Sequence, residues 1–427
     1  MLNADPGRPV RRARGSGGRG SAPLVRLSAL MAVLAIVAVV LGGCSSALSA
    51  GPVRPGPHVS QPEGRHELTP EDVTAWLDGK IPDALNRGDL PGAVITVVHN
   101  GRILVTRGYG HAATGADGEP QRPVDSDTLF RIASVSKLAT SISVMQLVER
   151  GELDLDTDIS TYIDVSIPRR FSGDITLRNL LTHTAGFEER GKNLVTSESG
   201  PFDLDKSVRQ DPPVQVFAPG TTPAYSNYGM SLAGYIVERV SGESFEDYVR
   251  EHVLEPAGMD SSTFDQPLPE RLAGRMANGY KTTGGRAQPF ELIDSPAGGM
   301  TTSGTDAGRF MLAMLNQSQG GALLEEGTWK QMFGPGLGAD QLGTLAEGKQ
   351  MGLGFFDESR NGHQIVGHEG GTVFQAELEI YPNDGSGVFV AVNGEGKDGA
   401  AALKDDLMRG FSDRYYPGSE PGAEGGP

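Results

Sequence analysis

The sequence predicts a two-lobed α+β protein, in which an antiparallel sheet is flanked by N- and C-terminal helices and a helical subdomain is inserted at about 150–290. Three observations support this class. A strand, turn and strand pattern around Asn100-Gly101 comes early, and helical periodicity then dominates residues 153–268. Strand patterns return only near the end of the chain. One sheet assembled from both chain ends fits this order.

The folded region begins with a capped helix. Thr69 is a polar residue that can cap a helix, Pro70 suits its first turn, and Glu71 and Asp72 follow as acids behind the cap. We expect Pro82 to kink or break this helix, because proline lacks the N–H group that the helix needs. Its apolar face comprises Val73, Trp76, Leu77, Ala84 and Leu85.

A β-hairpin and a core helix follow. Apolar segments 93–98 and 103–106 flank Asn100-Gly101, a dipeptide that suits a tight hairpin turn. The helix that starts at Ser134 is apolar on most sides through Val148, which is typical of a buried helix. A serine at its start would be held rigidly.

The rest of the folded chain supplies the inserted helices and the remaining strands. Helical periodicity is clear at 177–182, 230–240 and 245–253, with prolines and glycines between these segments. Strands are predicted at 375–380 and 387–392, and a last helix near 401–411. This pattern places the folded domain at 67–415, between a flexible tether at 44–66 and a disordered tail at 416–427.

The N-terminus has the pattern of a bacterial targeting segment. Six arginines precede a 15-residue apolar run, 27–41, which is short for a membrane span and suits a signal peptide. The one cysteine, Cys44, follows Leu41-Gly42-Gly43 and resembles a lipidation site, so we expect a lipoprotein signal peptide at 1–43. Cleaved secretion and an uncleaved anchor are the alternatives. One cysteine excludes internal disulfides.

The net negative charge of the chain restricts the classes of partner that it can bind. The chain carries a formal net charge of −17, and residues 1–43 carry six arginines and one aspartate, so the remainder carries −22. Such an acidic chain argues against nucleic-acid binding and favours solubility outside the cytoplasm. We therefore expect an extracytoplasmic protein that is held at the membrane by Cys44.

Ser134 and Lys137 form the first candidate for chemistry. Residues three apart share one face of a helix, so the Lys137 amine can reach the Ser134 hydroxyl. The start of the helix also offers unpaired N–H groups where an oxyanion would form. Both side chains are protonated in neutral water, so further groups must polarise the carbonyl and move the proton. A helix cap beside a solvated lysine is the alternative.

Two further polar clusters lie at the edges of predicted elements. Tyr225-Ser226-Asn227 opens the helix that follows Pro219-Gly220 and offers a phenol and an amide on one turn. His368-Glu369-Gly370-Gly371 forms a glycine-rich segment ahead of a predicted strand, where the backbone can approach a ligand closely. An ordinary turn is the alternative for the first cluster and a structural histidine for the second.

The three clusters, in this order, resemble the S-x-x-K, Y-x-N and H-x-G motifs of the serine β-lactamase and penicillin-binding protein superfamily, in its class C-like or DD-carboxypeptidase branch. The resemblance covers most of residues 70–415. It implies the β-lactamase/DD-peptidase fold. Four accessory stretches also match: 128–133, 180–186, 255–259 and 297–300.

The resemblance also implies a role for each residue. Ser134 would be the acylated nucleophile, Lys137 the amine that helps take its proton, and Tyr225 a phenolate-type base and later acid. Asn227 would orient substrate and Lys137. His368 and Gly370 would bind substrate, with His368 in the place of a lysine that lactamases usually have. The N–H groups of Ser134 and Gly371 would form the oxyanion hole. The family needs no cofactor or metal.

The substrate stays open between several classes. A DD-carboxypeptidase or D-peptidase acting on cell-wall peptides, an esterase, a β-lactamase and a non-catalytic cell-wall-binding or regulatory relative are the hypotheses. Glu369 occupies a position where a hydroxyl often holds a substrate carboxylate, which favours a neutral acyl substrate unless its side chain points to solvent. Val373-Phe374-Gln375 replaces a small turn with proline and changes the predicted edge of the pocket.

Other polar residues have more ordinary interpretations. We expect His183 to be structural, at the end of a short helix. Lys281-Thr282-Thr283-Gly284 is one residue too long for the K-T-G motif and suits a hairpin turn. Asp154, Asp156 and Asp158 alternate like calcium ligands, but Ile159 stands where a calcium loop needs glycine, so a solvated turn is expected.

Overall fold

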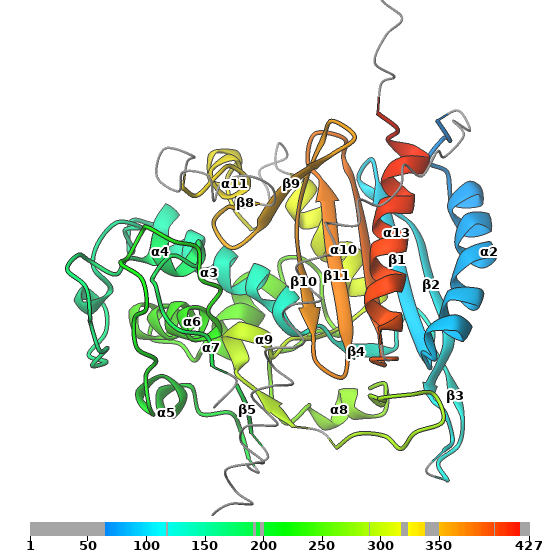
Figure 1. Ribbon diagram of the computed structural model, residues 1–427, viewed down its shortest axis with the longest axis horizontal. Helices are drawn as coiled ribbons and strands as arrows, with labels where there is room; N and C mark the ends of the chain where they lie inside the picture. The colour runs from blue at the N-terminus through cyan, green and yellow to red at the C-terminus, as the bar shows by residue number, and fades with distance from the viewer. Residues whose placement is uncertain are drawn as a thin grey trace, which may run out of the picture. The chain divides into compact units, whose positions relative to one another are not determined.

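An antiparallel sheet of eight strands forms the framework of the computed structural model (Figure 1). The strand order is β3-β2-β1-β12-β11-β10-β9-β8, so strands from the two ends of the chain meet where β1 pairs with β12. This arrangement confirms the predicted α+β class. The strands are β1 (Gly92–His99), β2 (Arg102–Ala113), β3 (Arg122–Pro123), β8 (Gln350–Met351), β9 (Phe356–Arg360), β10 (His363–Gly371), β11 (Gln375–Tyr381) and β12 (Ser386–Val392).

The structure describes residues 65–116, 118–190, 194–196, 200–289, 291–316, 323–337, 350–396 and 398–418. All of them belong to one unit, Glu63–Pro427. The predicted signal peptide at 1–43, Cys44 and nearly all of the tether lie outside the described residues, as does most of the predicted tail. Within the described part of the chain, none of the helices has both the length and the apolar character to cross a membrane.

The early hairpin forms as predicted. Asn100 and Gly101 both have positive φ angles, 48° and 76°, which the tight turn between β1 and β2 requires. The turn follows the pairing of His99 with Arg102. On the other side, β1 pairs with β12 from Ala93 opposite Val392 to the ends of both strands.

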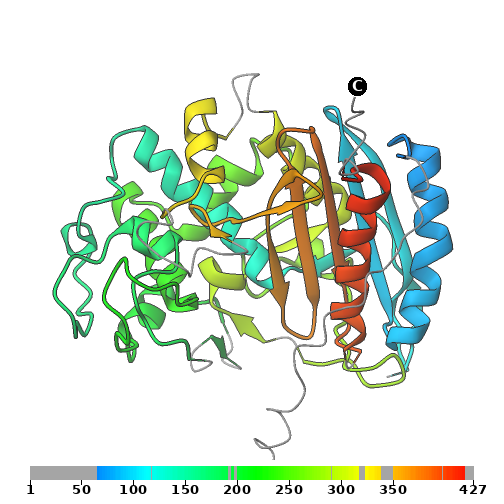
Figure 2. The ribbon, with the colours of Figure 1, turned by 45° about the horizontal axis from the view of Figure 1, so that its top comes forward.

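Two helices from opposite ends of the chain cover one face of the sheet, here called the rear face. Figure 2 shows α2 (Pro70–Gly88, blue) and α13 (Gly399–Tyr415, red) beside each other. Thr69 caps α2 by accepting a hydrogen bond from the Asp72 N–H at 3.2 Å. α2 runs through Pro82 without a break, so of the expected kink or break the second is wrong. Apolar side chains of α2 and α13 pack on alternate residues of β12, namely Val388, Val390 and Val392.

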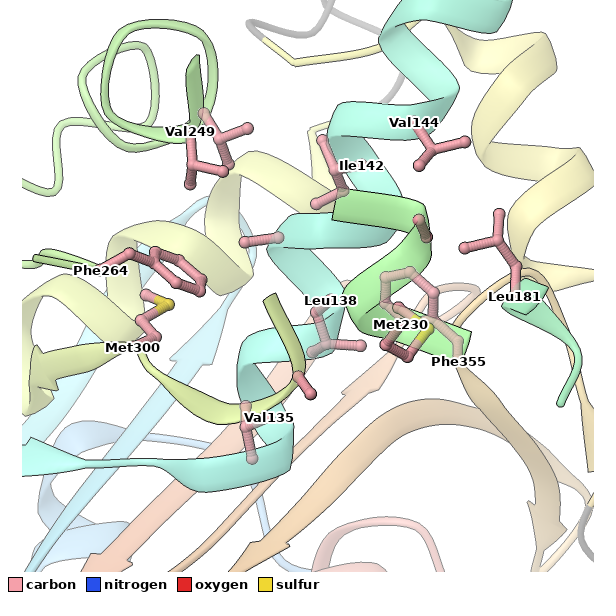
Figure 3. Close-up of a cluster of buried hydrophobic side chains, with 14 of the residues drawn as sticks. Val135, Leu138, Ile142, Val144, Leu181, Met230, Val249, Phe264, Met300 and Phe355 are labelled. Carbon is pink, nitrogen blue, oxygen red and sulfur yellow. The ribbon is translucent and has the colours of Figure 1, made fainter. Parts of the chain in front are cut away.

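The opposite, front face is covered by α10 (Gly304–Leu315) and by helices from the middle of the chain, centred on α3 (Lys137–Glu149). α3 is buried from Lys137 to Leu147 with one partial exception, which confirms the predicted core helix. Figure 3 shows its side chains Leu138 and Ile142 among residues from other elements. These neighbours include Leu181, Met230, Val249 and Phe355.

The middle of the chain contains short helices joined by long loops. The predicted segments correspond to α4 (Leu177–Leu181), α6 (Asn227–Ser241) and α7 (Phe245–Val249), the last continued by a π-helical turn, Arg250–Leu254. Other elements of this region and the following one are α5 (Leu204–Arg209), α8 (Glu270–Ala273), α9 (Ser295–Gly298), α11 (Glu326–Phe333), and two small sheets that pair β4 (Leu129–Arg131) with β7 (Thr301–Ser303) and β5 (Val195–Thr196) with β6 (Leu292–Ile293).

The ordered chain extends slightly beyond the predicted domain ends. Tyr416 was expected in the disordered tail, but it is only 3% exposed and stacks on Tyr381 with ring centroids 5.0 Å apart. At the other end, the His66 N–H donates to the Arg414 carbonyl oxygen at 3.1 Å. Both residues are therefore held by the rear layer.

Candidate active site

The candidate nucleophile lies on a tight turn in front of the core helix. Ser134 belongs to a 3₁₀ turn, Ala133–Ser136, which precedes α3 rather than forming its first residues. Ala133 has a φ angle of 46°, an unfavourable value for a residue with a side chain. The Ser136 hydroxyl donates to the Ala133 carbonyl oxygen at 2.5 Å, and accepts from the Met300 N–H at 3.0 Å. These bonds hold the strained turn in place.

Lys137 is fully buried beside Ser134. Its Nζ donates to Ser134 Oγ at 2.9 Å, to Asn227 Oδ1 at 2.7 Å and to the Ala297 carbonyl oxygen at 2.6 Å. Burial lowers the pKa of Lys137 to about 7, although the negative charges of Asp294 and Glu189 act in the opposite direction. A substantial fraction of this amine is therefore neutral near pH 7 and able to accept a proton.

Tyr225 completes the polar cluster around the nucleophile. Its ring lies over Lys137, with Nζ 5.1 Å from the ring centroid. Burial raises the pKa of the phenol above its usual range, and a hydrogen bond with Ser134 acts in the opposite direction. Tyr225 is consequently a protonated phenol at neutral pH.

His183 supports the loop that carries Tyr225. Its ring packs against Tyr225 at a centroid distance of 4.4 Å, and its Nδ1 accepts from the Ser226 N–H at 3.2 Å. The Ala224 N–H donates to the His183 carbonyl oxygen at 2.7 Å. Burial lowers the pKa of His183 to about 3, with Lys137 adding to the effect. This neutral, buried residue has the structural position that the sequence predicts.

Asn227 connects the nucleophile to a carboxylate that the sequence reasoning missed. It is the first residue of α6, whose cap is the Ser226 hydroxyl, 3.1 Å from the Gly229 N–H. Glu189 accepts two hydrogen bonds from Asn227, one from Nδ2 at 2.7 Å and one from the backbone N–H at 2.9 Å. No motif marks Glu189, which lies three residues beyond the accessory stretch at 180–186.

His368 lies inside β10, not on a turn ahead of a strand as the sequence indicated. It is 3% exposed, and its ring lies 4.8 Å from that of Phe356 and 6.2 Å from that of Tyr225. Nδ1 is 2.5 Å from the Glu369 carbonyl oxygen. Because a carbonyl oxygen only accepts, Nδ1 carries the proton in this arrangement.

Gly370 lets β10 approach the nucleophile closely. A Cβ atom at this residue would lie 2.2 Å from the Ile132 carbonyl oxygen and 2.8 Å from the Ser134 nitrogen. Only glycine fits there, and the approach brings the next residue, Gly371, to the side of the Ser134 turn. The oxyanion hole of Ser134 and Gly371 N–H groups remains a prediction that this geometry accommodates.

Glu369 does not face the nucleophile. Successive side chains of a strand point to opposite faces, so Glu369 projects to the rear while His368 and Gly370 face the front. Its side chain is 56% exposed, with Oε2 3.5 Å from Lys404 Nζ of α13. The side chain is thus directed away from the nucleophile, in agreement with the alternative that it points to solvent, and its charge contributes only a minor part of the raised pKa of Tyr225.

A pocket of about 650 Å³ is lined by Gly371, the last residue of β10, and by the residues that follow it. Its apolar lining includes Leu194, Met276, Ile293, Val373 and Phe374. Its charged side chains are two basic and two acidic ones, Arg131, Lys281, Glu291 and Glu395.

Arg131 in the wall of this pocket is bound by its own chain. Its guanidinium donates to the Glu291 carbonyl oxygen at 2.6 Å and to Gln266 Oε1 at 2.9 Å. The turn Val373-Phe374, which the sequence marks as a departure from the family pattern, packs closely on Gly279: a Cβ there would lie 2.7 Å from Val373. The pocket is thus largely apolar with balanced charge.

Asp294 is a second functional candidate that the sequence did not reveal. Its Oδ2 accepts from the Ser207 hydroxyl at 2.9 Å, and burial raises its pKa to about 6. It precedes α9, whose Ala297 carbonyl binds Lys137. The stretch 297–300, which the sequence could only match by resemblance, therefore supports both the amine and the Ser134 turn.

Metal ligands gather elsewhere in the described part of the chain. Glu243, Glu251 and His252 form the one group there whose ligand atoms lie close enough together to hold an ion. His252 Nε2 is 3.2 Å from Glu243 Oε1. Asp154, Asp156 and Asp158 instead bind backbone N–H groups and arginines, as expected of a solvated turn.

Comparisons with known proteins agree with this geometry. The family model described as Beta-lactamase matches residues 77–411. Esterase EstB of Burkholderia gladioli is 36% identical over 222 residues, which cover 48% of this chain and 55% of that relative. Protein flp of Staphylococcus aureus (strain MW2) is 28% identical over 255 residues, 57% of this chain and 49% of that relative. The chain spans about half the length of these curated relatives.

Solved structures share the fold. The octameric penicillin-binding protein homologue from Pyrococcus abyssi superposes with a TM-score of 0.67 at 24% identity, over 79% of this chain and 77% of that one. D-amino acid amidase from Ochrobactrum anthropi SV3 gives a TM-score of 0.65 at 22% identity, over 80% of this chain and 98% of the other. At such identities the likeness describes architecture alone.

Proposed function

The chain belongs to the beta-lactamase family and is a serine hydrolase, and we propose that it hydrolyses neutral carboxylic esters through an acyl-enzyme on Ser134. The observation that carries the proposal is the pocket beyond Gly371, which is mostly apolar and whose basic and acidic side chains balance. A substrate carboxylate would find Lys281 and the bound Arg131 there together with the acids Glu291 and Glu395, so it would gain no net charge attraction. A neutral acyl group needs no charged partner and can be buried against the apolar lining of such a pocket.

Acylation begins with proton transfer from Ser134 to Lys137. Ser134 Oγ forms a bond to the ester carbonyl carbon while its proton moves to the neutral Lys137 amine, 2.9 Å away. The N–H groups of Ser134 and Gly371 would receive the negative charge that develops on the carbonyl oxygen.

Attack of Ser134 gives a tetrahedral intermediate. Its collapse breaks the bond to the leaving alcohol, which takes a proton from the Tyr225 phenol. Tyr225 is then a phenolate, and Lys137, now an ammonium beside the Tyr225 ring, gives it the proton taken from Ser134, which restores the phenol and the neutral amine. The raised pKa of Tyr225 supports this role as an acid over a role as a phenolate base. Water then attacks the acyl-enzyme, and the same groups move its proton.

The leaving alcohol and the acyl group take different sides of Ser134. The alcohol must lie near Tyr225, because that phenol protonates it. The acyl group then points away from Tyr225, past Gly371 and into the pocket toward Val373 and Phe374. An apolar acyl chain gains on the order of 0.8 kcal/mol for each methylene group that it buries there.

Cell-wall peptides and β-lactams are the competing substrates. Both a DD-carboxypeptidase substrate and a penicillin carry a carboxylate, which the balanced pocket does not favour. A D-peptidase or amidase of neutral amides would use the same atoms with an amine as the leaving group. A non-catalytic cell-wall-binding or regulatory role would leave the arrangement of Ser134, Lys137 and Tyr225 without a purpose.

We also propose that the protein works outside the cytoplasm, held to the membrane by a lipid on Cys44. The supporting pattern is the arginine-rich start, the apolar run 27–41 and the small residues before the cysteine. Incorporation of a labelled fatty acid into the expressed full chain, and its loss in Cys44→Ala, is the expected result. Equal incorporation in both proteins would contradict it.

Two covalent probes test the reaction and the substrate class together. The full chain and its Ser134→Ala variant are treated with a fluorescent fluorophosphonate and with a fluorescent penicillin. We expect fluorophosphonate labelling of the wild type alone, hydrolysis of p-nitrophenyl esters, and weak or absent penicillin labelling. Strong penicillin labelling would favour the β-lactamase or DD-carboxypeptidase alternatives. No label from either probe would contradict an acyl-enzyme, and label retained in Ser134→Ala would assign another serine.

A further inference from the structure

We propose that Glu189 is a positioning residue for the Ser134–Lys137 pair: it fixes the amide of Asn227 and places a negative charge near Lys137, and so sets the pH at which Ser134 becomes reactive. The inference rests on the proposed acyl-enzyme function. Glu189 touches neither the nucleophile nor the amine in the structure and acts through Asn227.

The two hydrogen bonds to Glu189 determine which way the Asn227 amide faces. A carboxylate only accepts, so the group 2.7 Å from Glu189 Oε1 must be the amide NH₂. The amide oxygen is then directed to Lys137 Nζ, 2.7 Å away. With the amide reversed, an NH₂ group would face the lysine and remove one of its acceptors. Glu189 therefore maintains the hydrogen-bond acceptor that holds Lys137 beside Ser134.

The second bond fixes the carboxylate itself. Glu189 Oε2 accepts from the Asn227 N–H, which is at the first residue of the 15-residue helix α6. The start of a helix carries a partial positive charge and unpaired N–H groups, so a carboxylate is stabilised there. Glu189 is exposed, and this anchoring restricts a side chain that would otherwise be free to rotate.

The charge of Glu189 acts on a buried amine. Two acidic residues favour the protonated form of Lys137, Asp294 on the buried side and Glu189 on the exposed side. The other polar groups at Lys137 are uncharged, because His183 is neutral and Tyr225 protonated at neutral pH. The groups that face Lys137 are Ser134, His183, Glu189, Tyr225, Asn227, Asp294 and the Ala297 carbonyl.

The adjacent residue provides a matched control. Glu188 is an acid on the same loop, but its carboxylate is 3.2 Å from Arg190 Nε. It is not among the charges that act on Lys137. Glu188→Gln therefore removes the same charge from the same segment without releasing the Asn227 amide.

The sign of the expected change follows from the charge. Without the negative charge of Glu189, the ammonium form of Lys137 is less stable, so its pKa falls and Ser134 becomes reactive at lower pH. Glu189→Gln should therefore shift the acid limb of the rate profile down by about half a pH unit or more, and release of the amide should lower the plateau rate by about tenfold. Glu189→Asp keeps the charge but shortens the side chain, so it should lower the plateau while leaving the limb near its wild-type position.

The test is the rate of fluorophosphonate labelling of Ser134 in the full chain, measured from about pH 5 to about pH 9 for wild type and the three variants. Thermal unfolding of each protein reports whether it is folded. The proposal is supported by a downward shift of the limb in Glu189→Gln, its absence in Glu189→Asp, and a wild-type profile in Glu188→Gln. Superimposable profiles for Glu189→Gln and Glu188→Gln would overturn it. An equal limb shift in Glu189→Gln and Glu189→Asp would overturn the assigned role of the charge.

Failure of the underlying function has a separate outcome. Wild type that takes no fluorophosphonate label would reject the acyl-enzyme proposal. Wild type that labels normally, with folded Glu189 variants that label at the wild-type rate and pH, would reject only the role of Glu189.

Discussion

The two faces of β10 differ in burial and charge. On the front face, His368 is buried, and Gly370 lies so close to the Ser134 turn that a Cβ atom would clash there. On the rear face, Glu369 is directly opposite Glu377 of β11, and Lys404 lies 3.5 and 4.0 Å from the two carboxylates. Adjacent residues of β10 therefore belong to the candidate active site on one face and to a charged surface on the other.

The layers behind these faces differ in the same way. The rear layer joins α2 and α13 to the sheet through apolar side chains and is closed at its edge by Asp72, which accepts from Arg414 and Tyr415. The front layer buries Lys137, His183 and Asp294 together with many hydroxyl groups. Burying such groups costs free energy unless each has a partner. The polar groups that the front layer buries for catalysis therefore contribute less to the free energy of folding than the apolar side chains of the rear layer.

The largest effect is expected from Ser134→Ala on the front face. Removing the nucleophile should lower ester hydrolysis by about 10⁴-fold or more, because no neighbouring group can form the acyl-enzyme. Thermal unfolding should change little, since the hydroxyl is partly exposed. A variant with more than a tenth of wild-type activity would contradict the assignment.

Lys137→Met should have the next largest effect. It keeps the volume of the side chain but removes the base, so the rate should fall by about 10³-fold. In the wild type the rate should fall as pH drops below about 7, because Lys137 is then protonated and its pKa is about 7. A pH–rate profile measures both. A flat wild-type profile between about pH 5 and 8 would exclude Lys137 as the base.

Gly370→Ala tests the close contact of β10 with the nucleophile. The added Cβ must displace the Ser134 turn, so we expect activity to fall by about 10²-fold and stability by about 1–3 kcal/mol. Gly284→Ala is the matched control, because nothing lies within 4 Å of a Cβ there. Equal activities of the two variants would show that the contact is not needed.

Asp72→Asn should reverse the pattern, with lost stability and retained activity. Hydrogen bonds from Arg414 and Tyr415 hold the pKa of Asp72 well below its usual range. Because the pKa of Asp72 is lower in the folded protein than in the unfolded chain, its carboxylate stabilises the fold fully above the pKa of the unfolded chain, about 4. This stabilisation is lost as the pH falls toward the lower pKa of the folded protein. Chemical denaturation at neutral pH should show a loss of about 2 kcal/mol that shrinks in acid. An unchanged free energy of unfolding would show that the Asp72–Arg414 ion pair does not stabilise the fold.

The smallest effect is expected from Glu369→Gln. Its side chain faces Lys404 on the rear, so ester hydrolysis should stay within about twofold of wild type. A large gain in penicillin labelling would instead place the Glu369 charge at the substrate. The comparison of probe labelling between this variant and the wild type decides the matter.

The sequence predicted the elements that local patterns encode. Asn100-Gly101 requires positive φ angles and therefore forms the hairpin, and Thr69-Pro70 starts α2 as expected. Three motifs far apart in the chain marked the residues that the structure gathers around Ser134.

What the sequence could not give depends on tertiary contacts. The side of β10 to which Glu369 points follows from strand register, and a shift of one residue reverses it. Glu189 and Asp294 are ordinary acids until the fold places them near Asn227 and Lys137. Pro82 is tolerated because packing of α2 on the sheet outweighs its missing N–H.

The central claim is that Ser134 becomes the acylated residue with Lys137 as its base, and mass mapping of the trapped adduct tests it most directly. The full chain is labelled with a fluorophosphonate at about pH 8 and at about pH 5, digested and analysed by peptide mass. We predict one modified peptide, carrying the label on Ser134, with much slower labelling at the lower pH. A label on any other serine, or labelling of Ser134 at the same rate at both pH values, would contradict the account.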